Sequence, residues 1–102
     1  MRMNKRTKAV AITQDTKKIV HERDQGCCIL CGTPVTTAYS SAHYVPRSKG
    51  GLGIKENIVT LCFDCHAMFD QTVHRSEIEP FVKKHLNTFY PEFSDNDRIY
   101  RK

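Results

Sequence analysis

Two pairs of cysteines, each with two residues between its members, carry the strongest chemical signal in this chain of 102 residues. They are Cys28 with Cys31 and Cys62 with Cys65, and residues 32–61 lie between the pairs. A Cys-x-x-Cys turn can point its backbone amides at both thiolates, and four thiolates make a tetrahedral site for Zn²⁺. The pattern predicts one structural Zn²⁺ that ties the two pairs together.

A fifth cysteine leaves the first pair open to a second assignment, Cys27 with Cys31. We favour Cys28, because two intervening residues form the tighter turn and Gly32 then supplies the permissive backbone that such a turn uses. Cys27 is expected to be a spare, small buried or half-buried thiol. The sequence begins without the apolar core of a secretion signal, which favours metal binding over disulfides.

The residues between and after the cysteine pairs read as strand, loop, strand and helix. Residues 38–46 are strand-like, a glycine-rich loop follows, and β-branched residues make 58–61 a second strand. A helix is expected from the second cysteine pair to about residue 70. A neutral imidazole, with a pKa near ~6.5, can take a proton at physiological pH. The chemically capable side chains at the element boundaries are His43, Asn57 and His66.

These three residues, in this order and in this layout, resemble the signature of the HNH nucleases, which have a ββα-metal fold. The resemblance covers a core motif at 27–70 and implies a metal-dependent DNA endonuclease or nickase that leaves 3′-hydroxyl and 5′-phosphate ends. It implies that His43 is the general base, its ring oriented by a backbone carbonyl across the loop, and that Asn57 pins that loop. His66 is the implied ligand of one catalytic divalent ion, Mg²⁺ or Mn²⁺, and Asp70 lies on the same helix face as a second ligand.

One position departs from the family pattern. Many members carry Asp or His immediately before the general base, and here that residue is Ala42, which has no ligand atom. Three outcomes stay open. The ion is held by His66, Asp70, water and DNA phosphate alone, or Asp64 or His74 substitutes, or the site is degenerate.

The formal charge of +5 suits a polyanion such as double-stranded DNA, although charge alone is weak evidence. On the loop between the strands, the expected contacts to DNA phosphates are Arg47, Lys49 and Lys55, which would give affinity without base specificity. The longest apolar run is far below the ~18 residues of a membrane span, so we expect a cytoplasmic protein of a bacterial or phage-infected cell. Small HNH proteins of this appearance in phages also suggest a role in DNA packaging, with terminase or portal proteins as partners.

The expected fold class is small α+β, with the ββα motif and its zinc knuckle flanked by an N-terminal and a C-terminal helix. Thr13 or Asp15 can cap a first helix at 13–24. Ser76 with Glu79 matches a capping box for the last helix, although Pro80 leaves the start of that helix open. The expected organisation is a solvated basic arm, a single nuclease domain and a tail that packs back on it, at 1–12, 13–90 and 91–102.

Two other classes of protein fit parts of the pattern. One is a catalytically inactive zinc-ribbon module that binds nucleic acid, with salt-sensitive binding and no cleavage. The other is a packaging-accessory protein whose nuclease site needs a partner. A bare ribbon gives no reason for Asn57 and His66 to stand where they do, so the endonuclease is the favoured hypothesis.

Overall fold

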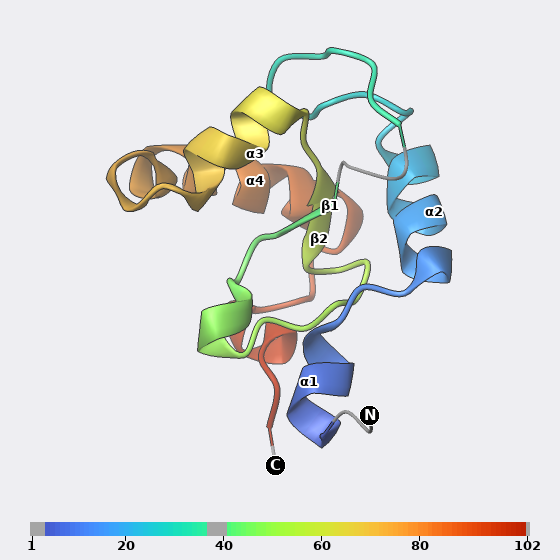
Figure 1. Cartoon of the computed structure of the whole chain (residues 1–102), viewed down its shortest axis with the longest axis vertical. Helices are drawn as coiled ribbons and strands as arrows, with labels where there is room; N and C mark the ends of the chain where they lie inside the picture. The colour runs from blue at the N-terminus through green and yellow to red at the C-terminus, as the bar shows by residue number, and fades with distance from the viewer. Residues whose placement is uncertain (1–3, 37–40, 102) are drawn as a thin grey trace.

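The computed structural model describes residues 4–36 and 41–101. Two short helices open the chain, α1 (Lys5–Val10) and α2 (Gln14–Arg23), and Figure 1 shows them following one another along one side of the molecule. The Thr13 side chain accepts a hydrogen bond from the Thr16 N–H at 3.1 Å. Thr13, one of the two predicted caps, is therefore the N-cap of α2, because it satisfies a backbone donor that the helix leaves free.

The N-terminal segment corrects the prediction of a solvated basic arm at 1–12. Residues 1–3 lie outside the described part of the chain, but α1 forms and Val10 is only 6% exposed. The Gly53 N–H donates to the Ala9 carbonyl at 3.0 Å, so the segment is docked on the loop between the strands. The lysines and the arginine of α1 are exposed. Because these charged residues dominate the segment, nothing in the sequence indicated that Val10 is buried.

The sheet consists of two antiparallel strands, β1 (Ser41–His43) and β2 (Ile58–Thr60). The register sets Ala42 opposite Val59 and His43 opposite Ile58. Both strands were predicted, but as longer segments, of which residues 37–40 lie outside the described chain. The chain leaves β1 soon after His43 and, beyond Pro46, enters the 3₁₀ helix η1 (Arg47–Lys49), because proline cannot donate to a strand ladder.

Two helices complete the motif, α3 (Phe63–Asp70) and α4 (Thr72–Phe89). The predicted capping box is wrong, because α4 begins at Thr72 and contains Pro80 in its interior. Proline inside a helix removes one backbone hydrogen bond and costs about 3 kcal/mol when exposed. Here Val82 and Leu86, both fully buried, hold the helix against the core and offset that loss.

The core is formed where the sheet meets α3 and α4, and Figure 1 shows α4 passing behind the two strands. Its buried members come from every part of the motif: Cys28, Ala42, Tyr44, Val59, Leu61, Phe69, Val82 and Leu86. The C-terminal tail contacts this unit through the 3₁₀ helix η2 (Asp95–Arg98). The fully buried Arg98 donates from Nε to the Glu56 carbonyl at 2.7 Å. The small α+β class predicted from the sequence is confirmed.

Across residues 4–36 and 41–101, none of the helices combines the length and the apolar character needed to span a membrane.

Candidate active site and metal centre

Four thiols converge where the turn after α2 meets the start of α3. The Sγ atoms of Cys28, Cys31, Cys62 and Cys65 all lie within 4.8 Å of one another. Zn–S bonds of about 2.3 Å in a tetrahedron place the sulfurs about 3.8 Å apart, and Cys31 Sγ lies 3.6 Å from Cys62 Sγ. The predicted set is brought together, and Cys27 lies outside it. The donor set therefore fits a structural ion.

The electrostatics of the thiols favour the same conclusion. Hydrogen bonding with Thr33 lowers the pKa of Cys31 to about 6, whereas burial and the neighbouring thiols raise the pKa of Cys65. Four thiols packed this closely cannot all ionise alone, since each new negative charge opposes the next. A divalent cation at their centre removes that conflict.

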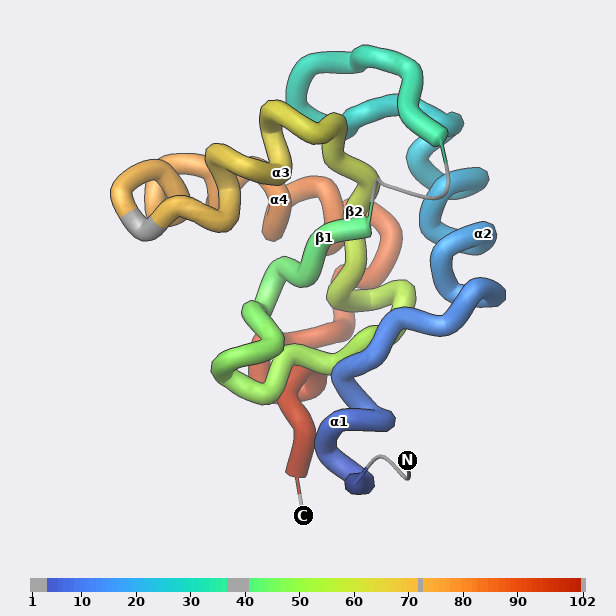
Figure 2. Tube along the Cα trace, viewed as in Figure 1, coloured from blue at the N-terminus to red at the C-terminus, as the bar shows by residue number. Residues whose placement is uncertain are grey.

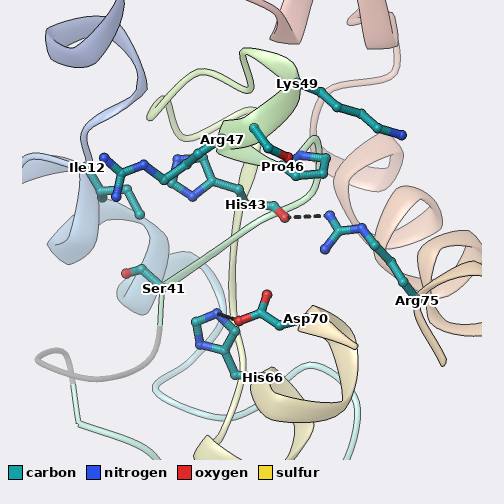
Figure 3. A pocket seen from close by; sticks show the side chains of 10 residues that line it. Ile12, Ser41, His43, Pro46, Arg47, Lys49, His66, Asp70 and Arg75 are labelled. Atoms are coloured by element: carbon teal, nitrogen blue, oxygen red, sulfur yellow. Dashed lines mark hydrogen bonds and ion pairs between the residues drawn. The ribbon is translucent and has the colours of Figure 1, made fainter. Parts of the chain in front are cut away.

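A separate cleft of about 590 Å³ lies beside β1, between η1 and α3. Both predicted imidazoles, His43 from the end of β1 and His66 from α3, line it. Figure 3 shows His66 and Asp70 together on α3, on the opposite side of the cleft from Arg47 and Pro46. The cleft thus gathers two imidazoles, a carboxylate and cationic groups, which together can move a proton and stabilise negative charge.

His43 has a fixed ring orientation. Its Nε2 lies 2.8 Å from the carbonyl oxygen of Val10. Because a carbonyl only accepts, Nε2 carries the proton, and the lone pair of the neutral ring is on Nδ1. Burial, together with the charges of Arg47, His66 and Arg75, lowers the pKa of His43, which favours the neutral, basic form. The carbonyl was expected across the loop and comes instead from the end of α1.

His66 and Asp70 form the second part of the cleft. One helical turn apart, they place Nε2 and Oδ2 3.4 Å from one another, which suits two ligands of one divalent ion. Ala42 is buried and offers no ligand, and neither Asp64 nor His74 lines the cleft. In the described part of the chain, the four cysteines are the only group of three or more potential ligands close enough to share an ion. The cleft therefore offers two protein ligands, and the 66% exposed side chain of Asp70 leaves room for water or phosphate.

Asn57 is fully buried immediately before β2 and holds the loop that follows β1. Its Oδ1 accepts from the Val45 N–H at 2.8 Å. Its Nδ2 donates to the Leu52 carbonyl at 2.8 Å and to the Val45 carbonyl at 3.2 Å. These are the bonds expected of a residue that pins the loop after His43.

The HNH endonuclease family model matches residues 28–82, more than half of the chain. This chain belongs to the HNH endonuclease family. No curated protein and no solved structure matches it significantly. The matched stretch holds the four cysteines and both sides of the cleft, whereas α1, α2 and the C-terminal tail lie outside it.

The three basic residues predicted to contact DNA phosphates do not all line the HNH cleft. Arg47 and Lys49 line the cleft from η1. Lys55, expected to act with them, is not part of the cleft lining, and its ammonium group lies 5.9 Å from the centre of the Tyr90 ring.

Arg75 is a residue of the HNH cleft that sequence reasoning missed. Its Nη2 donates to the carbonyls of Tyr44 at 2.6 Å and His43 at 3.1 Å, and its Nη1 donates to the Phe69 carbonyl at 3.2 Å. The guanidinium also stacks on the Phe69 ring at 4.0 Å. Arg75 thus fixes the end of β1 to the end of α3. Arg75 comes just before the capping box predicted at Ser76, and its neighbours in the sequence give no sign of the distant carbonyls that it contacts.

Proposed function

We propose that the chain is a metal-dependent DNA endonuclease or nickase. The observation that carries the proposal is the shared cleft, in which His43 and His66 both face a space bordered by Arg47 and Lys49. A cleft with one basic nitrogen, two ligand atoms and two cationic side chains fits the hydrolysis of a phosphodiester. Family membership supports a nuclease function, and the lining residues support its details.

In the proposed reaction, His43 Nδ1 accepts a proton from a water molecule as the water oxygen bonds to phosphorus. The bond from phosphorus to the 3′ oxygen then breaks, and the 3′ oxygen takes up a proton from solvent water, which leaves a 3′-hydroxyl and a 5′-phosphate. His43 afterwards releases its proton to solvent, which restores the neutral ring. Arg47 and Lys49 bind the phosphate and offset the charge that builds on its oxygens. The lowered pKa of His43 keeps the ring ready to accept the proton near neutral pH.

His66 and Asp70 would hold the catalytic divalent ion, Mg²⁺ or Mn²⁺, with water and DNA phosphate as its other ligands. Such an ion supplies Lewis-acid stabilisation of the phosphate and of the leaving oxygen. With two protein ligands, we expect weak binding of this ion without DNA. The four thiolates would hold Zn²⁺ in a structural role.

A plasmid assay tests the proposal. With Mg²⁺ or Mn²⁺, the purified protein should convert supercoiled plasmid to open-circular or linear product. His43→Ala should abolish cleavage and leave the zinc content unchanged. His74→Ala replaces a histidine outside the cleft lining and should cut like the parent. If His43→Ala cuts as fast as the parent, His43 is not the base.

One observation favours the second candidate, a catalytically inactive module that binds nucleic acid. Ala42, the residue before His43, has no ligand atom, whereas many HNH proteins carry Asp or His at this position. That module would bind DNA in a salt-sensitive manner, without cleavage, and would tolerate changes at His43 and His66. A packaging role with terminase or portal partners stays a prediction. It would be favoured by a protein that is inactive alone and cuts after such a partner is added.

A further inference from the structure

The ring of His43 makes its one side-chain hydrogen bond, within residues 4–36 and 41–101, to an element outside the matched family region. The acceptor is the carbonyl of Val10, the last residue of α1, at 2.8 Å from Nε2. The match to the HNH endonuclease family begins only at residue 28. The orientation of the proposed base therefore depends on a segment that the family motif does not contain.

That carbonyl is held in place by buried contacts. The Val10 side chain is 6% exposed, and the Gly53 N–H donates to the Ala9 carbonyl at 3.0 Å. Figure 2 shows this N-terminal segment running alongside the loop that joins the two strands. Asn57 donates to the Leu52 carbonyl of the same loop at 2.8 Å, so the loop against which the N-terminal segment packs is itself held by a buried side chain.

Gly53 is the residue that permits this close approach. A Cβ atom at position 53 would lie 2.1 Å from the Ala11 carbonyl oxygen and 2.9 Å from the Val10 carbonyl oxygen itself. Both distances are below those that real Cβ atoms adopt, and both neighbours are backbone atoms that have no side-chain freedom to move aside. An alanine at this position must therefore displace the carbonyl that His43 contacts.

From this geometry we propose that the Val10 carbonyl, supplied by a segment that the family match does not include, is a positioning group that fixes the tautomer and ring plane of His43. The expected effect on kcat rests on the proposed function, whereas the expected tautomer and orientation of the His43 ring do not. By accepting from Nε2–H, the carbonyl leaves the lone pair on Nδ1, the nitrogen assigned to the attacking water. A ring without this partner populates both tautomers and several orientations, and only part of the population can act as the base.

Nitrogen-15 NMR of the imidazole rings in the zinc-loaded, full-length protein tests the structural part without any need for activity. At mildly alkaline pH, where the ring is neutral, His43 should show a single tautomer with the proton on Nε2. A predominant Nδ1–H tautomer in the parent protein would overturn the proposal. This measurement needs no variant, so a folding failure cannot obscure it.

Gly53→Ala tests the kinetic part in the full chain. We expect the His43 signals to shift toward a mixture of tautomers and kcat for plasmid cleavage to fall about tenfold or more. KM and zinc content should stay within about twofold, because Arg47, Lys49 and the four cysteines are untouched. If the His43 signals change and kcat does not, the carbonyl has no positioning role. Lys8→Gln, which alters the exposed face of α1 and leaves its backbone in place, is the matched control and should preserve both readouts.

The two assays separate the two proposals. If the parent protein shows the Nε2–H tautomer and never cuts DNA, the proposed function fails while the structural role of Val10 stands. If the parent cuts and Gly53→Ala cuts equally well with a disturbed ring, the function stands and the role assigned to Val10 fails.

Discussion

The side-chain amide of Asn57 is bonded to the backbone of Val45 on both sides, accepting from its N–H at 2.8 Å and donating to its carbonyl at 3.2 Å. Val45 lies beyond the end of β1, and the Asn57 side chain provides the two hydrogen bonds that a neighbouring strand would otherwise provide to its backbone. His43 lies two residues before Val45, so the same bonds limit how far the proposed base can move.

Asn57→Ala should lower the free energy of unfolding by about 2–4 kcal/mol. The substitution removes three hydrogen bonds and leaves the Val45 N–H without a partner in a part-buried position. Urea denaturation of the zinc-loaded protein measures the change. Asn87→Ala on α4 is the control, expected within about 0.5 kcal/mol of the parent. Equal stabilities for the two variants would contradict the loop-pinning role.

The thiol cluster predicts opposite results for two adjacent cysteines. Cys28→Ser should lose bound zinc and unfold, because Cys28 belongs to the four-sulfur group. Cys27→Ser should keep the metal and the fold, since its thiol lies outside that group. Elemental analysis and circular dichroism of both variants measure this. Loss of zinc in Cys27→Ser with retention in Cys28→Ser would reverse the assignment.

A charge network away from the cleft predicts acid sensitivity. The carboxylate of Asp24 accepts from Arg23 at 2.8 and 2.9 Å, from His85 at 2.7 Å and from the Thr60 N–H at 2.9 Å. Burial alone would raise the pKa of Asp24, but these bonds outweigh it and lower the pKa from 3.8 to about 2. A carboxyl with a depressed folded-state pKa stabilises the fold above its ordinary pKa, and that stability is lost as the pH falls below it.

The corresponding contribution is about 2 kcal/mol, present at neutral pH and lost as the pH falls from about 4 toward 2. Urea denaturation at a series of pH values should show this loss in the parent protein. Asp24→Asn should be less stable at neutral pH and should show a shallower dependence on pH in the acid range. Parallel pH curves for the two proteins would mean that Asp24 is not the group responsible.

Arg75→Lys should reduce kcat about tenfold while leaving the zinc content unchanged. A lysine keeps the charge but cannot donate to the His43, Tyr44 and Phe69 carbonyls together, because it lacks the planar fork of the guanidinium. Steady-state plasmid cleavage measures the effect. Arg101→Lys changes an exposed arginine of the tail and should cut like the parent. A fully active Arg75→Lys would show that the carbonyl contacts do not position His43.

The parts of the site that could be predicted are those that local patterns encode. Cysteine spacing identified the four sulfurs, and the β-branched run at 58–61 and the position of Asn57 identified the second strand and its start. These signals depend on neighbours in the sequence, so no knowledge of the folded chain was needed.

The contacts that could not be predicted join residues far apart in the chain. Val10 stands among lysines and arginines, and only its burial against the loop near Gly53 reveals its proximity to His43. Arg75 comes just before the capping box predicted at Ser76, and Pro80 disfavours a helix by local propensity, whereas packing of Val82 and Leu86 holds α4 together through the proline. In both cases tertiary packing overrode the local signal.

The buried Arg98 limits how this nuclease motif can be transplanted. A graft cut at the family boundaries, 28–82, would omit Arg98, whose guanidinium donates to the Glu56 carbonyl, and would end before Leu86 of the core. It would also omit Val10 and Asp24, on which His43 and β2 depend. Engineers who wish to fuse this HNH module to a new DNA-targeting domain should therefore carry over both flanks and attach the partner beyond them.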